Sequence, residues 1–132
     1  MDRDWWKTYL DEVNSTFLGE RFSNNAHSGN YRTTRITNKC YSNSGAGAIV
    51  VAIVGGAKRI ILLGYDCQKT QGKAHWHGDH PKHLGNANKI DSWGEKFAEL
   101  NKDYQHIEII NASRETALTC FPQMDLNKCL HY

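Results

Sequence analysis

The stretch NSGAGAIVVAIVGGAKRIILLGYD, residues 43–66, decides the fold class of this chain. Its second part, RIILLGYD at residues 59–66, is an aliphatic run bounded by charge and glycine, which is typical of a strand buried on both faces. The small and apolar residues before it fit a strand or a helix by periodicity alone. Their length and small size favour a helix packed closely against a sheet, with Ser44 as the N-cap and Gly55-Gly56 as the stop. A helix that leads directly into a buried strand predicts an α/β protein.

The flanking sequence repeats this alternation. Residues 4–18 and 89–104 predict amphipathic helices, the first with Trp6, Tyr9, Leu10, Val13 and Phe17 on one face. Residues 106–113 alternate as a strand, one or two short strands are expected around 31–36, and Pro122 breaks the tail into short helical turns. Helices that alternate with apolar strands predict a mostly parallel sheet flanked by helices and joined by right-handed crossovers.

Size and composition narrow the class of protein further. The length of 132 residues predicts one domain, 1–132. The net charge is +2 and no basic stripe stands out, so no nucleic-acid partner is expected. Its most apolar run, Ala48–Ala57, is far shorter than the about 20 residues that cross a bilayer, and MDRDWWK is no secretory leader. We therefore expect a cytoplasmic protein without a membrane partner. Its four cysteines form no C-x-x-C pair and are expected to be reduced thiols.

Three polar segments are expected to meet at one ligand-binding rim. Residues 43–45 open the helix, 64–66 end the strand, and 113–116 follow the next strand. Ligands of parallel sheets bind at the carboxyl ends of the strands, where free N–H groups of helix N-termini favour phosphate or carboxylate. The alternatives are plain helix capping, a strand-terminating turn and a surface ion pair of Arg114. The predicted ligand-binding residues are Asn43, Ser44, Gly45, Gly64, Tyr65, Asp66, His77, Arg114 and Thr116.

Between the strand and the next helix, residues 67–88 form a long polar loop that contains HWHGDH, residues 75–80. This hexapeptide matches the H-x-H-x-D-H pattern of metallo-β-lactamase-like hydrolases. The α/β order is wrong for that αββα sandwich, and too little chain follows His80 for its second half. The loop can instead bind one divalent metal, contact a ligand, supply a general acid or base, or simply be solvated. Candidate catalytic residues are His75, His77 and His80; minority candidate metal ligands are His75, His77, Asp79 and His80, with His83 nearby.

Residues 43–66 resemble a pattern found in sialyltransferase-like and archaeal hydroxymethylpterin diphosphokinase-like proteins. The shared features are a (T/N)-S-G opening, a small-residue helix and a strand that ends in G-x-D. The resemblance implies a Rossmann-like fold that binds nucleotides or nucleotide-sugars through residues 43–45 and 64–66. The stretch from Trp5 to Leu126, with GKAHWHGDHP and NASRETALTCFP, is also similar to small uncharacterised bacteriophage-encoded proteins. That second resemblance implies the host cytoplasm as the location.

Compared with these Rossmann-like families, the strand expected before the first helix is absent, so the fold is expected to be truncated at its N-terminus. An uncovered sheet edge favours homo-oligomers, and an incomplete site favours binding over transfer. The leading hypothesis is a phage-type protein that sequesters a nucleotide-derived small molecule, such as a host defence signal. The alternatives are a glycosyltransferase- or diphosphokinase-like transferase with a nucleotide substrate, and a metal-dependent hydrolase that uses the HWHGDH loop.

Overall fold

The computed structural model describes residues 3–69, 72, 80–81, 84 and 89–131. The described elements alternate between helices and strands, and the strands pair in two small parallel sheets of two strands each, so the α/β class is confirmed. In chain order the elements are α1 (Arg3–Thr16), β1 (Phe22–Ser23), the 3₁₀ helix η1 (Ser28–Tyr31), β2 (Thr34–Arg35), α2 (Ser44–Val54), β3 (Arg59–Leu62), the 3₁₀ helix η2 (Ile90–Ser92), α3 (Trp93–Asp103), β4 (Glu108–Asn111) and α4 (Leu126–Leu130).

The central sheet consists of β3 and β4, which run parallel with Ile60 opposite Ile109. At its start, the Arg59 Nε atom lies 2.8 Å from the Glu108 carboxylate across the two strands. On the side of β4 away from β3, Asn111 forms an isolated parallel β-bridge with Gln123. The expected strand 59–66 is shorter, since β3 ends at Leu62. Gly64 has a φ of 71°, which breaks the extended conformation.

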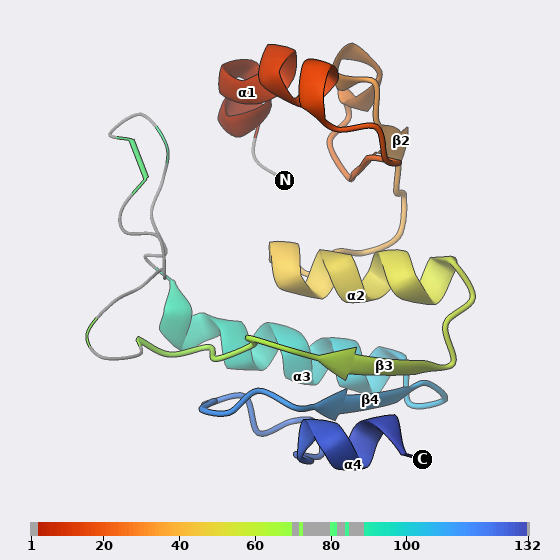
Figure 1. Ribbon diagram of the computed structural model, residues 1–132, viewed down its shortest axis with the longest axis vertical. Helices are drawn as coiled ribbons and strands as arrows, with labels where there is room; N and C mark the ends of the chain where they lie inside the picture. Colours follow the sequence, from red (N-terminus) through yellow and green to blue (C-terminus); the bar gives the residue numbers. More distant parts are fainter. Residues whose placement is uncertain (1–2, 70–71, 73–79, 82–83, 85–88, 132) are drawn as a thin grey trace.

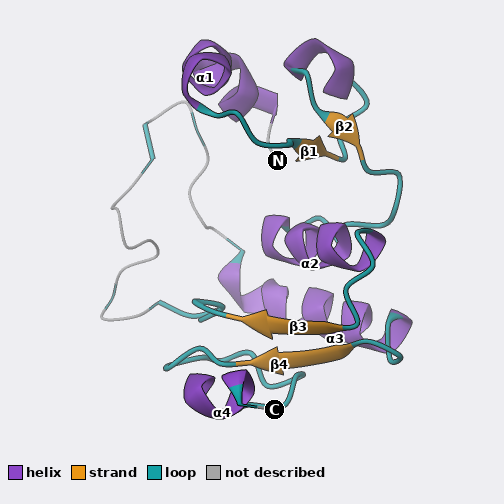
Figure 2. Ribbon diagram, turned by 45° about the vertical axis from the view of Figure 1, so that its right-hand side comes forward, coloured by secondary structure: helices purple, strands orange, loops and turns teal. Residues whose placement is uncertain are grey.

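Three helices surround this sheet. α2 runs along β3 on the side away from β4, α3 lies behind the two strands, and α4 packs beside β4 (Figures 1 and 2). The main core joins α2 and α3 to the side chains of one face of the strands, with Ile49, Phe97 and Leu100 buried. A smaller cluster joins Cys129 of α4 to the other face. The core of this half of the molecule thus lies between α2, α3 and one face of the sheet, with α4 on the other face.

The helix limits correct several predictions. Asn43, not Ser44, caps α2: its φ of −140° is extended, and its side chain accepts a hydrogen bond from the N–H of Ala46. The expected helix 89–104 begins as η2 and becomes α-helical only at Trp93. α1 buries Trp6 as predicted, but it ends at Thr16 and leaves Phe17 50% exposed.

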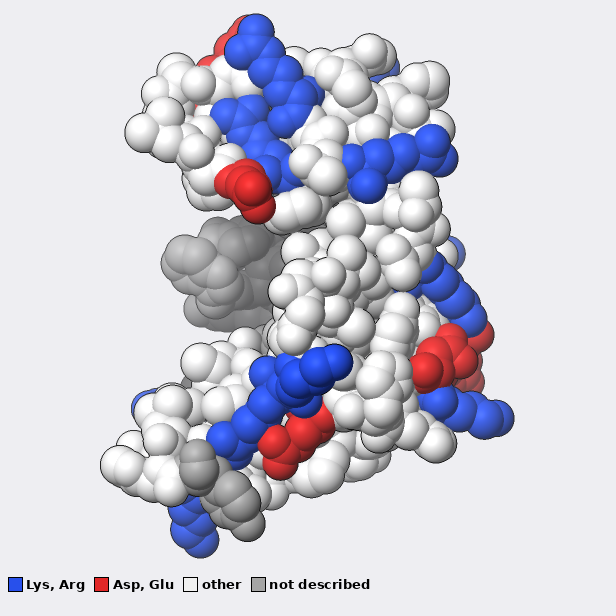
Figure 3. Space-filling model, turned by 90° about the vertical axis from the view of Figure 1, so that its right-hand side faces the viewer, with Lys and Arg blue, Asp and Glu red and all other residues white. Residues whose placement is uncertain are grey.

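The N-terminal part of the chain forms a separate layer above α2 (Figure 1). Trp6 of α1 stacks on Tyr31 of η1, with ring centroids 5.7 Å apart, and β1 pairs parallel to β2. A narrower middle joins this layer to the sheet, and on the face shown in Figure 3 the basic side chains are interspersed with acidic ones. Among the described residues, no helix has both the length and the apolar character that crossing a bilayer requires.

Candidate functional site

The three polar segments that were expected to meet, residues 43–45, 64–66 and 113–116, do lie close together. The N-terminal end of α2 and the carboxyl ends of β3 and β4 lie on the same side of the molecule (Figure 1). Tyr65 links them: its hydroxyl donates to the carbonyl of Gly45 at 3.1 Å, and its N–H donates to the Ser113 Oγ atom at 2.8 Å. The Thr116 hydroxyl donates to the Tyr65 carbonyl at 2.7 Å. The segments after β3, after β4 and at the start of α2 are thus joined by hydrogen bonds.

The polar groups of Tyr65 and Thr116 form hydrogen bonds within the protein, as the Asn43 side chain does at the start of α2. The Thr116 hydroxyl, besides donating to Tyr65, accepts from the amide of Asn111 at 3.1 Å and from the N–H of Leu118 at 3.0 Å. Tyr65 is half-buried, and burial, followed by the nearby Cys67, raises the pKa of its phenol. The observed contacts of Tyr65 and Thr116 are therefore structural, and their roles toward a ligand stay predictions.

Gly45 allows the close approach between α2 and this turn. A Cβ atom at Gly45 would lie 3.1 Å from the Tyr65 Cε1 atom and 3.3 Å from the Phe97 Cζ atom. Both distances are tighter than ordinary van der Waals contact, so a larger residue would push the ring of Tyr65 away. Gly45 therefore serves packing of α2 against Tyr65 and Phe97.

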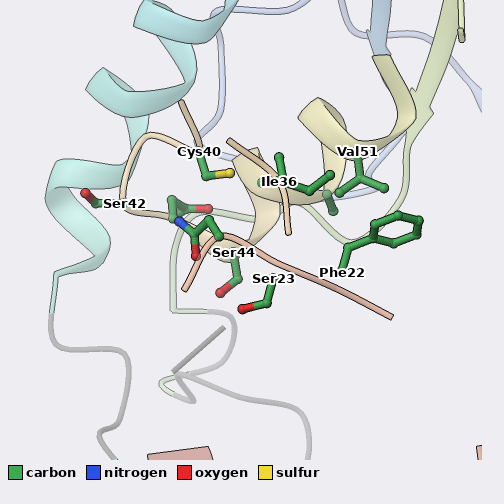
Figure 4. A pocket seen from close by; sticks show the side chains of 11 residues that line it. Phe22, Ser23, Ile36, Cys40, Ser42, Ser44 and Val51 are labelled. Carbon is green, nitrogen blue, oxygen red and sulfur yellow. The ribbon is translucent and has the colours of Figure 1, made fainter. Parts of the chain in front are cut away.

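A cavity of about 600 Å³ lies beside the start of α2. Figure 4 shows the hydroxyl groups of Ser23 and Ser44 close to each other on one side of the cavity. The apolar side chains of Phe22, Ile36 and Val51 lie at the end of the cavity away from Ser42. The cavity thus combines a polar part at the helix N-terminus with an apolar part under β1. Its lining residues are Phe22, Ser23, Asn24, Ile36, Cys40, Ser42, Asn43, Ser44, Gly47, Ala48 and Val51.

The polar part owes its character to the helix. The Asn43 side chain accepts from Ala46 at 3.0 Å, whereas the N–H groups of Ser44 and Gly45 have no hydrogen-bond acceptor among the described residues. No charged residue occurs from Cys40 to Ala57, so no local carboxylate offsets the positive end of the helix dipole. This end of the cavity is suited to an anion.

Of the predicted ligand-binding residues that the structure describes, only Asn43 and Ser44 line this cavity. Gly64, Asp66 and Arg114 line a second hollow of about 1040 Å³, which lies between the carboxyl ends of the strands and residues 123–127. The structure thus divides the predicted rim between two hollows, and Gly45, Tyr65 and Thr116 line neither of them.

The histidine loop falls largely outside the described residues. His75, His77, Asp79 and His83 are all outside them, so the candidate catalytic and metal-binding roles of these side chains stay predictions. His80 is described and half-buried. Within the described part of the chain, no three His, Cys, Asp or Glu side chains are grouped so that they could hold a metal ion.

Sequence reasoning missed the residues that close the cavity opposite α2. Phe22, Ser23, Ile36 and Cys40 lie in a segment that is polar, turn-rich and only weakly alternating, which does not mark one face. Phe22 and Ser23 reach the cavity because β1 pairs with β2. Comparisons with models of protein families, with curated proteins and with solved structures found no match for this chain.

Proposed function

We propose that this protein binds a nucleotide or nucleotide-derived small molecule in the cavity beside α2. Its phosphate would lie at the N-terminal end of α2, beside the N–H group of Ser44, and its base or other apolar part against Phe22, Ile36 and Val51. The observation that carries the proposal is that the open N-terminal end of α2 and these apolar side chains line one cavity.

The size and the chemistry of the cavity support this ligand class. Its volume of about 600 Å³ lies within the range of small-molecule sites, roughly 300–1,000 Å³. The Ser23 and Ser44 hydroxyl groups can donate hydrogen bonds to phosphate or ribose oxygens. The described lining has no Lys or Arg, so recognition of the anion would rest on backbone N–H groups.

The order of elements supports a Rossmann-like interpretation of this half of the chain. α2, β3, α3 and β4 follow one another, the two strands are parallel, and the start of α2 lies at their carboxyl ends. Nucleotides bound by such folds lie at this end of the sheet, with phosphate at a helix N-terminus.

We further propose that the molecule is held without being converted. Among the described lining residues, Cys40 is the only one with a titratable side chain, and burial raises its pKa. A thiol that stays protonated is a poor nucleophile and a poor general base. Sequestration fits this lining better than transfer does.

Titration calorimetry with adenosine monophosphate, a nucleotide-sugar and inorganic phosphate tests the proposal. We expect adenosine monophosphate to bind more tightly than phosphate and to be recovered intact. Ser44→Glu would place a carboxylate at the open helix end, which suits the helix dipole but repels phosphate. We expect it to lower affinity at least tenfold without lowering the melting temperature.

Ser92→Glu, at the start of α3 and outside the lining, is the matched control and should leave affinity unchanged. Equal affinity of the wild type and Ser44→Glu, or conversion of the bound molecule to a product, would contradict the proposal.

A further inference from the structure

The segment that closes the polar part of the cavity has an unusual backbone. Cys40, Ser42, Asn43 and Ser44 all line the cavity, and the N–H of Asn43 donates to the carbonyl of Cys40 at 3.2 Å to close a turn. Its two central residues, Tyr41 and Ser42, have φ values of 55° and 52°. A left-handed conformation at two consecutive positions favours Gly and Asn, not Tyr and Ser. Tertiary contacts must therefore hold this turn.

The contacts that hold it come from α3. The Tyr41 ring is buried, with 5% exposed, and its hydroxyl donates to the Asp103 carboxylate at 2.7 Å. Lys39 lies over this ring, its Nζ atom 4.7 Å from the centroid, and it pairs with Glu99 at 2.6 Å. Lys39 Nζ also lies 3.5 Å from the Asp103 carboxylate. Two carboxylates one helical turn apart, Glu99 and Asp103, thus hold Lys39 and Tyr41, the neighbours of Cys40 on either side.

The position of Asp103 adds a second argument. It is the last residue of α3, where the helix dipole disfavours a negative charge. The hydroxyl of Tyr41 and the ammonium group of Lys39 offset that cost. The Asp103 carboxylate is unfavourable for α3 but forms a hydrogen bond with Tyr41. This indicates that the contact stabilises the turn 40–43 and not the helix.

We infer that the Tyr41–Asp103 hydrogen bond positions Asn43 and Ser44 for the ligand, which makes Tyr41 a positioning residue for the cavity. This inference rests on the proposed function for the identity of the ligand, but not for the state of the turn. Affinity would thus depend on a contact with the carboxyl end of α3, outside the lining of the cavity.

Tyr41→Phe tests the inference, because it keeps the buried ring and removes only the hydroxyl. We expect a loss of about fivefold to tenfold in affinity for adenosine monophosphate in calorimetry. Ser42→Gly, added to Tyr41→Phe, should restore the affinity, since glycine adopts the left-handed backbone without strain. A purely structural role of the hydroxyl would lower stability without this rescue. Tyr9→Phe, on a half-buried tyrosine of α1 outside the lining of the cavity, is the control and should bind like the wild type.

Amide hydrogen exchange separates this inference from the proposed function. The N–H of Ala46 is bonded to the Asn43 side chain and reports on the turn without any ligand. Exchange there should be faster in Tyr41→Phe and slow again when Ser42→Gly is added. If the wild type bound no adenosine monophosphate, the proposed function would fail while this exchange pattern would still support the inference. Unchanged exchange and unchanged affinity in Tyr41→Phe would overturn it.

Discussion

The Tyr65 hydroxyl donates a hydrogen bond to the carbonyl of Gly45 at 3.1 Å, which joins the turn after β3 to the first turn of α2. These residues are distant in sequence, and their contact brings the end of the strand against the start of the helix. Their closeness depends on the absence of a side chain at Gly45. The polar segments at the end of β3 and the start of α2 are therefore held together by the packing of Tyr65 against Gly45.

Gly45→Ala should destabilise the protein. The added methyl group would press on the Tyr65 and Phe97 rings, and overpacking of this kind costs about 1–3 kcal/mol, against a gain of at most about 1 kcal/mol in helix propensity. Urea unfolding should show a net loss of roughly 1 kcal/mol. Gly94→Ala, in the first turn of α3 with open space around it, should instead be neutral or stabilising. A stabilised Gly45→Ala protein would contradict the close packing.

Thr116→Val should cost roughly 2 kcal/mol in free energy of unfolding. The hydroxyl bonds the Tyr65 carbonyl and the Leu118 N–H, and a valine would leave both without this partner. Thr119→Val, on an exposed threonine nearby, should change stability by less than about 0.5 kcal/mol. The comparison is made by urea unfolding monitored by tryptophan fluorescence, and equal effects of both substitutions would refute the structural role of Thr116.

Asn43→Ala and Ser44→Ala distinguish the two candidate caps of α2. Because the Asn43 side chain accepts from the Ala46 N–H, Asn43→Ala should lower stability by about 1 kcal/mol. Ser44 is the first helical residue, and Ser44→Ala should leave stability within about 0.5 kcal/mol of the wild type. Thermal unfolding of both variants checks this order, and the reverse order would restore Ser44 as the cap.

Stability should fall in strong alkali through the cluster around Tyr41. Burial, then the hydrogen bond to Asp103, raises the pKa of Tyr41, and the hydrogen bond to Glu99 raises that of Lys39. The charges of Tyr104 and Glu99 raise the pKa of Tyr41 further. Folding thus favours the protonated forms, so this stabilisation is complete below the ordinary pKa values, near 10, and is lost as the pH rises through the raised ones.

The measurement is the urea midpoint at pH 8 and at pH 11. The wild type should lose more stability over this interval than Tyr41→Phe, which has no phenol to ionise. In acid, the hydrogen bond from the Tyr41 hydroxyl lowers the pKa of Asp103. The stability that this bond contributes is therefore complete above the ordinary pKa of an aspartate and is lost as the pH falls through the lowered one. Tyr41→Phe should therefore raise the pKa of the Asp103 carboxyl in an NMR titration. An unchanged Asp103 titration would contradict the hydrogen bond.

Cys67 should react slowly with iodoacetamide. Burial, then the nearby Cys120 and Asp66, raises the pKa of its thiol to about 11, so little thiolate is present at pH 8. We expect alkylation roughly 100-fold slower than in the urea-unfolded chain, since each unit of pKa lowers the thiolate fraction about tenfold. Peptide mapping by mass spectrometry follows the rate at this cysteine. Equal rates in the folded and unfolded chains would show that the thiol is not buried.

Much of the second half of the fold was predictable because its signals are local. The aliphatic run at Arg59–Leu62 predicts a buried strand, and apolar spacing predicts α3. The end of α2 follows from Gly55-Gly56. The convergence of the three polar segments follows from one rule of parallel sheets, that strand ends and helix starts share an edge.

The sequence could not predict the cavity, because its two walls come from separate parts of the chain. Nothing local to Phe22 or Ile36 indicates that these residues face α2, since that depends on the pairing of β1 with β2 and on the path of the linker. The choice of Asn43 over Ser44 as the cap was likewise open, because both side chains can cap a helix and only the backbone angles decide.

The sequence by itself thus determined the class of the fold and the edge on which its polar segments meet, since hydrophobic periodicity and glycine positions are properties of neighbouring residues. Tertiary structure alone decided that Tyr65 and Thr116 bond within the protein, and that Asn43 and Gly64 line different hollows. It also decided the left-handed turn at Tyr41 and Ser42, because the contacts with Asp103 and Glu99 outweigh local backbone preference. Contacts between residues far apart in the chain carry that information, and no short stretch of sequence contains them.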